Sequence, residues 1–468
     1  MTKKIKISAF LLIIIIIIAA VGVYAFNQIQ NRDNYRIISF DSERAYNDVE
    51  ALISIGPRLS GTDEEYRGAV YIKRQFEEAG LYDVHIEDYE VLLYEVNFAS
   101  VSLIHYLPLG TLPNPMEYPV EYMHTVDFVV QGYSGSYEWS SYSDDLEMIV
   151  IEDDSNDGEW EDAQDKAAII TGEAGWASNT ELFFKASDFG VAALILHRAD
   201  NDLEMGHVPI SKSTGLPSGK SIYPDIPFFM VSEDMGDDMK EGINSGMKLR
   251  LNFDVIVEMR DTRVVLGDVR GSEKPEKFVM LGGHHDTVYN GPGAVDNTVG
   301  TVTVIELARQ LARTNPKRTI RLATWGGEEE GLWGSRLYNE AHEEDVLRNC
   351  MSYLNFDMNN IDLMRGKDVS LLVTDNGSIK HMEAISSQLM RNEPELKKYN
   401  VDIIYYNLLK IGSDHLPFLR NGIDVAASFG SESYEYHTYL DNIDHVNTES
   451  LSVSGRIFGS YALYLADK

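Results

Sequence analysis

The segment FVMLGGHHD, residues 278–286, joins a short apolar run to two glycines and a polar cluster. The apolar run has the length and the β-favouring side chains of a buried strand, and the glycines end it. The strand would therefore deliver His284 to one edge of a sheet. In open α/β sheets, ligands bind outside the carboxyl ends of the strands. The segment thus predicts an α/β fold with a functional site at this edge.

Two further apolar runs end in the same way. Residues 319–325 are followed by GGEEEG, residues 326–331, and residues 351–356 are followed by Asp357. Residues 298–312 carry apolar side chains at a spacing near 3.6, which predicts a helix. Strands that alternate with a helix of this length are typical of α/β proteins.

Five residues at or near these strand ends form a potential metal-binding set: His284, Asp296, Glu329, Asp357 and, late in the chain, His437. Zinc and similar ions bind imidazole nitrogen and carboxylate oxygen. Two ions roughly 3.5–4 Å apart can share one bridging carboxylate. With Asp296 as the bridge, each ion receives one histidine and one carboxylate of its own. The set predicts a site for two divalent metal ions.

Two residues have expected roles beside this set. Glu328 directly precedes Glu329 at a strand end, where adjacent side chains point in different directions, so one can bind metal while Glu328 accepts a proton from water. Asp286 follows His284 by two residues and would fix the tautomer of that imidazole. Singly, none of these residues is specific, because an acidic run usually lies on a solvated surface. The ordered pattern carries the prediction.

Six motifs resemble, in order, those of the zinc aminopeptidases of metallopeptidase family 28: GHHDTV (283–288), PGAVDN (292–297), EEEGLWGS (328–335), NFDM (355–358), SDHLPF (413–418) and YHT (436–438). The resemblance covers about residues 262–468. It implies a mixed, mostly parallel central sheet flanked by helices, and a zinc-dependent exopeptidase that uses two ions.

The resemblance also implies a role for each site residue: His284 and Asp357 on one ion, Glu329 and His437 on the other, Asp296 between them, and Glu328 as the base. It further implies that Tyr436 donates a hydrogen bond to the tetrahedral oxyanion.

An aminopeptidase acting on peptides with a free N-terminus is the favoured activity. A carboxypeptidase or dipeptidase of the same fold is the alternative, and it would need a basic residue for the substrate carboxylate. Arg420 is the only arginine near the SDHLPF motif, and it is expected to cap a helix instead. The complete ligand set with Glu328 disfavours a metal-free, receptor-like binding protein. A cyclase that uses a single zinc is disfavoured because both His284 and Asp357 are present.

The N-terminus predicts a membrane segment. Three lysines within the first six residues precede residues 7–26, which are apolar and uncharged and long enough to span hydrocarbon. The lysines predict that this end stays in the cytoplasm. Residues 23–25 (VYA) could be a signal-peptide cleavage site. Residues 1–26 are therefore an anchor, the favoured interpretation, or a cleaved signal peptide. The protein is expected at the cell membrane, single-pass with its catalytic domain outside the cytoplasm, or secreted.

The rest of the chain divides into four segments: a linker (27–37), the first part of the catalytic domain (38–110), an insert (111–255) and the remaining catalytic domain (256–468). Residues 41–55 and 62–79 have helical periodicity, and residues 83–106 alternate as strands. In the insert, DKAAIITG (165–172) and GVAALIL (190–196) loosely resemble a protease-associated domain, so a β-rich fold is expected. An unrelated β-rich insert is the alternative.

Composition limits the partners. The chain has 40 basic and 74 acidic residues, a formal net charge of −34, which argues against nucleic acid or an anionic membrane surface as a partner. The single cysteine, Cys350, excludes an intrachain disulfide and fits a small core residue. The expected partners are peptides and, through the N-terminal segment, the membrane. Nothing in the sequence indicates an oligomeric state.

Overall fold

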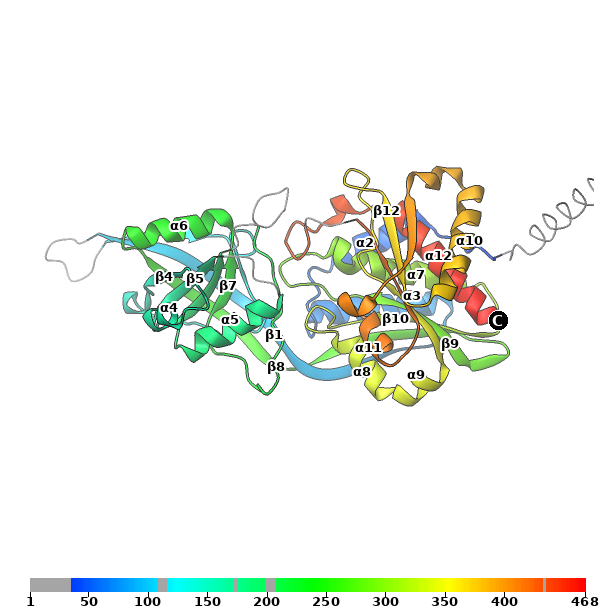
Figure 1. Cartoon of the computed structure of the whole chain (residues 1–468), viewed down its shortest axis with the longest axis horizontal. Helices are drawn as coiled ribbons and strands as arrows, with labels where there is room; N and C mark the ends of the chain where they lie inside the picture. The colour runs from blue at the N-terminus through cyan, green and yellow to red at the C-terminus, as the bar shows by residue number, and fades with distance from the viewer. Residues whose placement is uncertain (1–34, 108–115, 172–175, 198–207, 432–434) are drawn as a thin grey trace, which may run out of the picture.

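The computed structural model describes residues 35–107, 116–171, 176–197, 208–431 and 435–468. The expected membrane segment, residues 7–26, lies outside these ranges. Within them, no helix combines the length and hydropathy needed to cross a bilayer. The described chain forms two lobes, a larger one and a smaller one (Figure 1).

A sheet of nine strands forms the larger lobe and extends along β8, β1 and β2 into the smaller one. In spatial order they are β13 (Asn400–Tyr405), β12 (Asp368–Val373), β14 (Val425–Phe429), β11 (Cys350–Phe356), β9 (Lys274–His284), β10 (Arg318–Trp325), β8 (Lys248–Val269), β1 (Tyr82–Leu107) and β2 (Met116–Tyr122). Four pairings are parallel and four are antiparallel. The sheet is mixed, so the expectation of a mostly parallel sheet is wrong. The reason is that β8, β1 and β2 extend one edge with antiparallel pairs.

Helices cover both faces of this sheet. One face packs on α2 (Ser42–Ile53), α3 (Asp63–Ala79), α7 (Val299–Leu311), α10 (Asn376–Asn392) and α12 (Thr448–Asp467). The other packs on α8 (Trp333–Ala341), α9 (Glu343–Asn349) and α11 (His415–Arg420). Alternate residues of β9 serve the two faces: Val279 and Leu281 lie in the first core, and Phe278 and Met280 in the second. Burial on both faces explains why this strand reads as a continuous apolar run.

The smaller lobe contains a sheet of five strands in the order β3 (Phe128–Val130), β7 (Phe228–Val231), β6 (Ala193–His197), β5 (Ala167–Thr171) and β4 (Met148–Ile151). The strands β4 to β7 are parallel and β3 is antiparallel. One face packs on α6 (Glu233–Asn244) and on the far halves of β1 and β8, and the other on α4 (Asp157–Asp162) and α5 (Trp176–Asp188). The insert, expected to be β-rich, thus combines a five-stranded sheet with the helices α4, α5 and α6.

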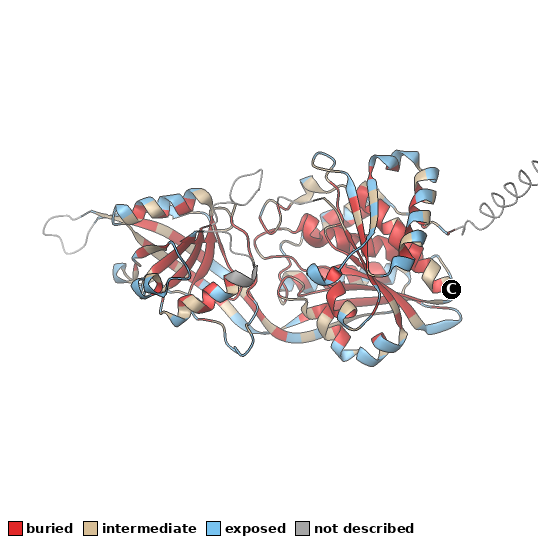
Figure 2. Ribbon diagram, viewed as in Figure 1, coloured by how far each residue is buried: buried red, intermediate tan, exposed pale blue. Residues whose placement is uncertain are grey.

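Two long antiparallel strands connect the lobes. β1 and β8 pair from Tyr82 with Asp268 to Ile104 with Lys248, and both run from one lobe into the other (Figure 1). Buried residues follow the strands of both sheets (Figure 2). The expected helices over 41–55 and 62–79 are confirmed as α2 and α3.

Short helical turns complete the described chain: a π turn at Ala294–Thr298, and 3-10 turns at Tyr142–Asp144, Pro394–Lys398, Leu408–Lys410 and Ile443–His445. The helix expected over residues 298–312 is α7, and the π turn precedes it.

Candidate active site

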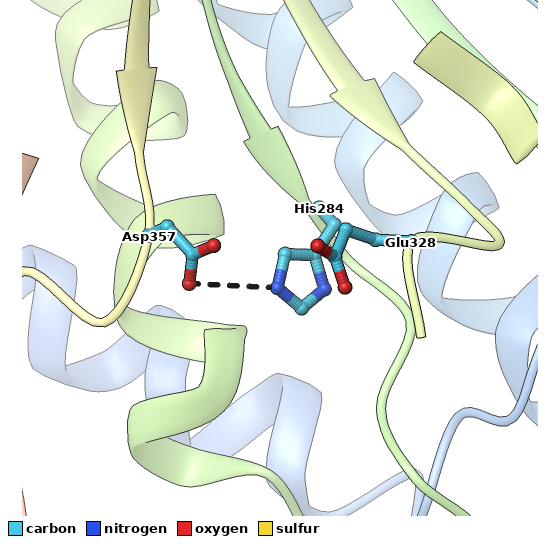
Figure 3. A group of neighbouring side chains, drawn as sticks. All are labelled: His284, Glu328 and Asp357. Carbon is cyan, nitrogen blue, oxygen red and sulfur yellow. Dashed lines mark ion pairs between the residues drawn. The ribbon is translucent and has the colours of Figure 1, made fainter. Parts of the chain in front are cut away.

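Three neighbouring parallel strands bring the expected residues together. In the sheet, β9 lies between β11 and β10, and His284 pairs with Trp325 at the end of β10. The loop after β10 therefore places Glu328 beside His284, and Asp357 follows β11 directly. Figure 3 shows the Asp357 carboxylate directed at the His284 imidazole, and the Glu328 carboxylate close to the same ring in this view.

The turn before Asp296 needs a glycine. Gly293 has a φ of +60°, and a Cβ there would lie 2.2 Å from Thr287 Cγ2 and 2.4 Å from the carbonyl oxygen of Asp296. The backbone N–H groups of Val295 and Asp296 donate to the two carboxylate oxygens of Asp441, at 2.8 and 2.9 Å. The backbone that carries Asp296 is thus fixed by the tight turn at Gly293 and by the hydrogen bonds to Asp441.

Asp296 lies between the two histidines. Its Oδ1 is 3.2 Å from His284 Nε2, and its Oδ2 is 3.2 Å from His437 Nε2. His284 Nε2 is also 3.7 Å from Asp357 Oδ1, and His437 Nε2 is 2.8 Å from Glu329 Oε2. Ligands about 2 Å from a tetrahedral zinc ion lie roughly 3.3 Å from one another. These atoms therefore form two sets, each spaced to hold one metal ion, and the carboxylate of Asp296 belongs to both.

The burial and hydrogen bonding of the five residues fit bound cations. All five are buried, with exposures between 1% and 7%. Within the described residues, Glu329 Oε1 is buried and has no hydrogen-bond partner, and the buried His437 Nε2 faces the carboxylate oxygens of Glu329 and Asp296. Carboxylates are costly to bury unless a cation or hydrogen bonds compensate them. The donor set, two imidazoles and three carboxylates, fits two divalent metal ions.

Asp286 contacts residues of both sets. His284 Nδ1 is 3.2 Å from the backbone carbonyl of Asp286 and 3.4 Å from its Oδ1, and Asp286 Oδ2 accepts the N–H of Glu329 at 3.2 Å. Because Nδ1 faces these acceptors, the Nε2 atom of His284 faces Asp296 and Asp357. The expected partner is therefore in place, with its backbone carbonyl closer than its carboxylate.

Glu328 lies at the edge of the first set. One atom each of His284, Glu328 and Asp357 falls within a 4.8 Å group. Burial raises the pKa of Glu328 well above its usual value, and the negative charges of Asp357 and Glu329 add to this effect. For His284, burial alone would lower the pKa, but the surrounding carboxylates, led by Glu328, outweigh it and raise it well above its usual value. A carboxylate of raised pKa suits proton transfer near neutral pH.

Tyr436 lies against the second histidine. Its ring stacks on that of His437, with centroids 3.7 Å apart and 19° between the planes. Its hydroxyl oxygen is 3.2 Å from Lys212 Nζ. Burial raises the pKa of Tyr436 well above its usual value, so the phenol keeps its proton and can donate it in a hydrogen bond.

A cavity of about 700 Å³ opens beside these residues, and both lobes line it. The larger lobe supplies Glu328, Glu329, Leu332, Leu416, Arg420, Tyr436 and His437, and the insert supplies Asn179, Ile210, Lys212 and Met230. The sequence did not predict the insert residues, because no local pattern marks them. Arg420, expected to cap a helix, ends α11 and lines the cavity. Within the described residues, its side chain has no hydrogen bond or ion pair.

A buried arginine supports the loops around the site. Arg58 is fully buried in the GPRLSG turn between α2 and α3. Its side chain donates to the carbonyl of His285 at 2.9 Å, to Thr298 Oγ1 at 2.6 Å and to the carbonyl of Leu52 at 3.2 Å. This turn is therefore tied to the segments that carry His284 and Asp296.

Comparison with known proteins agrees with this geometry. Residues 264–462 match the sequence model described as Peptidase family M28. The chain is 27% identical to a glutamate carboxypeptidase 2 homolog of Caenorhabditis briggsae over 55% of its own length and 37% of that protein. It is 25% identical to aminopeptidase YwaD of Bacillus subtilis strain 168 over 95% of its own length and 89% of that protein.

Among solved structures, BSAP, a zinc aminopeptidase from Bacillus subtilis, has the same fold. The TM-score is 0.70 with 21% sequence identity, over 92% of this chain and 97% of that one. The chain spans 37% to 55% of the length of the first curated relatives that it matches.

Proposed function

We propose that this chain is a zinc-dependent aminopeptidase with two metal ions, which removes N-terminal residues from peptides. The observation that carries the proposal is Asp296, whose two carboxylate oxygens each face a different histidine at 3.2 Å. The match of residues 264–462 to Peptidase family M28 supports it, as does the likeness to relatives named as aminopeptidases.

The residues of the chain divide the chemistry between them. Two divalent ions, when bound, supply Lewis acidity for the scissile carbonyl and lower the pKa of water. Glu328 accepts a proton from the attacking water and passes it to the leaving amine. Tyr436 donates its hydroxyl proton in a hydrogen bond to the oxyanion that forms on the substrate. Asp286 keeps His284 oriented, and carboxylates around the metal site hold the ammonium group of the substrate.

The test compares aminoacyl-anilides that have a free amine with the same compounds acetylated on the amine. Cleavage should require the free amine, and it should stop on addition of a metal chelator and return with zinc. Equal cleavage of the acetylated compounds would contradict the aminopeptidase proposal. Cleavage that persists in excess chelator would contradict the metal mechanism.

One observation favours a second activity, a carboxypeptidase or dipeptidase. Arg420 lines the cavity, and the structure shows no ionic partner for it among the described residues. A guanidinium group binds a carboxylate through two parallel hydrogen bonds, so it could hold the C-terminus of a short substrate. Release of residues from the C-terminus, with a KM that rises in Arg420→Gln, would establish this activity over the first.

We further propose that the N-terminal segment anchors the protein with its peptidase outside the cytoplasm, and that the insert is a protease-associated domain. The lysines before residues 7–26 support the orientation, and the motifs at 165–172 and 190–196 support the domain. Protease added to intact cells should digest the peptidase. Protection of the peptidase until lysis would contradict the orientation.

A further inference from the structure

We propose that the insert completes the catalytic site, and that Lys212 is the residue that positions Tyr436. The inference rests on the proposed function, because it concerns the oxyanion donor of that reaction. It begins from the segment 208–214, which belongs to the insert in sequence and reaches the metal ligands in space.

The segment is held firmly on the insert side. The carbonyl of Lys212 accepts the N–H of Gly132 at 2.8 Å, and Thr214 Oγ1 donates to the carbonyl of Gly132 at 3.0 Å. A Cβ on Gly132 would lie 2.8 Å from Ser213 Cα, so the two backbones are in close contact. Gln131 Nε2 donates to the carbonyl of Ile210 at 2.8 Å. The segment is therefore a fixed part of the insert.

The same segment orients a metal ligand. The N–H of Ser211 donates to the carbonyl of His437 at 3.2 Å, and His437 Nδ1 lies 2.9 Å from the carbonyl of Ser211. A carbonyl only accepts, so Nδ1 carries the proton of the neutral imidazole. The lone pair then lies on Nε2, which faces Glu329 and Asp296. The insert thus fixes the tautomer that the metal site needs.

Lys212 contacts Tyr436, the residue directly before His437. Its Nζ is 3.2 Å from the hydroxyl oxygen of Tyr436 and 4.2 Å from the centre of that ring. An ammonium group has three donors and no acceptor, so in this contact the tyrosine oxygen must accept. The hydroxyl proton of Tyr436 is then directed away from Lys212 and is available to an oxyanion in the cavity. The positive charge also polarises the hydroxyl group, which makes it a better donor.

A contact between Lys212 and the substrate is the rival explanation, because Lys212 also lines the cavity. The two explanations differ in the kinetic parameter that changes. Loss of a positioning residue removes stabilisation found only in the transition state and lowers kcat. Loss of a substrate contact present throughout the reaction raises KM alone.

The experiment compares Lys212→Met and Lys212→Arg with wild type and with Lys220→Met. Lys220 is an exposed lysine of the same insert that does not line the cavity. We expect Lys212→Met to lower kcat by about 10- to 100-fold, the loss typical of residues that orient metal-site groups, with KM within about threefold of wild type. Lys212→Arg should retain most of kcat, because a guanidinium group also only donates. Lys220→Met should match wild type.

Two further measurements separate this role from general damage. Metal content by elemental analysis should stay at the wild-type level in Lys212→Met. Calorimetry should show weaker binding of a peptide phosphonate, which mimics the tetrahedral intermediate, by the same factor as kcat. In a Tyr436→Phe background, Lys212→Met should change kcat by less than about twofold, because the two residues act through one hydrogen bond.

Three results would overturn the inference: a rise in KM with kcat unchanged, full additivity with Tyr436→Phe, or loss of metal from Lys212→Met. None of these three results would contradict the proposed function. That function fails on a different result, namely wild-type protein loaded with zinc that cleaves none of the free-amine substrates.

Discussion

At the residue scale, two adjacent glutamates are expected to do different work. Glu329 Oε2 lies 2.8 Å from His437 Nε2, within the second set of donor atoms, whereas Glu328 lies beside His284 and Asp357. The N–H of Glu329 is fixed by Asp286. These two consecutive residues therefore have different surroundings, so we expect Glu329 to bind metal and Glu328 to act as the base.

The first prediction separates these two roles by amide substitution. Glu328→Gln keeps the size of the side chain but cannot accept the proton, so kcat should fall by roughly 10²–10⁴ while metal content stays near wild type. Glu329→Gln should reduce metal occupancy, because a neutral amide is a poor ligand. Kinetics and elemental analysis on the same preparations check both. The control is Glu340→Gln, an exposed glutamate on α8. Metal loss from Glu328→Gln, or its full activity, would show that the roles are misassigned.

The candidate site could be predicted at this scale where the signal is local. His284, Glu329 and Asp357 follow apolar strands, and strand ends in an α/β sheet are where ligands gather. Lys212 was not predicted, and Arg420 was expected to cap a helix rather than to line the cavity. They reach the cavity through the packing of loops that are distant in sequence, and no periodicity or spacing records such a contact.

At the element scale, the turn that carries Asp296 depends on one glycine. Gly293→Ala would place a Cβ 2.2 Å from Thr287 Cγ2 and force a positive φ on alanine, a conformation that costs about 1–3 kcal/mol. The backbone of Asp296 should shift, and both metal ions should bind more weakly, because both share this ligand. Metal titration followed by calorimetry measures the change. Gly215→Ala, where a Cβ meets nothing within 4 Å, is the control and should bind as wild type does.

A second prediction at this scale concerns the turn between α2 and α3. Arg58→Met would leave the carbonyl of His285 and the hydroxyl oxygen of Thr298 without their donor, whereas the carbonyl of Leu52 keeps the N–H of Ile55. Each of these two unsatisfied buried groups costs about 1–3 kcal/mol, so the free energy of unfolding should fall by about 2–6 kcal/mol. Denaturant unfolding gives the value. Arg74→Met, on the exposed side of α3, should change it by less than about 0.5 kcal/mol. Equal effects would refute the structural role of Arg58.

Helices and strands were easier to predict than their pairing. The apolar periodicity of residues 41–55 and 62–79 is local, and α2 and α3 form there. Strand direction depends on which strands become neighbours. The sequence of β1 does not show that β8 is its antiparallel partner, so the mixed character of the sheet could not be foreseen.

At the scale of the whole molecule, the buried carboxylates make stability depend on metal. The purified protein should hold close to two divalent ions per chain. A chelator should lower its thermal midpoint by about 5 °C or more, since ligands that bind only the folded state stabilise it. Elemental analysis and a thermal melt test this, with zinc-saturated chelator as the control. A stoichiometry of one, or an unchanged midpoint after metal removal, would contradict the prediction.

The insert shows which properties of the whole chain could be predicted from sequence and which could not. The change of character near residue 111 indicated an insert, because composition is a property of a segment. The contact of that insert with His437 and Tyr436 is a property of two surfaces. Such a contact depends on how the two lobes pack, and the sequence does not show that packing.

The two strands that connect the lobes also determine the order in which the protein can form. Ile104 of β1 pairs with Lys248 of β8, and all five strands of the smaller sheet lie between them in the chain. During synthesis β1 emerges long before this partner, so its pairing must wait until the insert has been made. Once β8 follows, the smaller lobe has every strand it needs, while β9, β10 and β11 are still to come. We therefore expect the smaller lobe to fold first during synthesis, and the catalytic sheet, which still needs β9, β10 and β11, to close last.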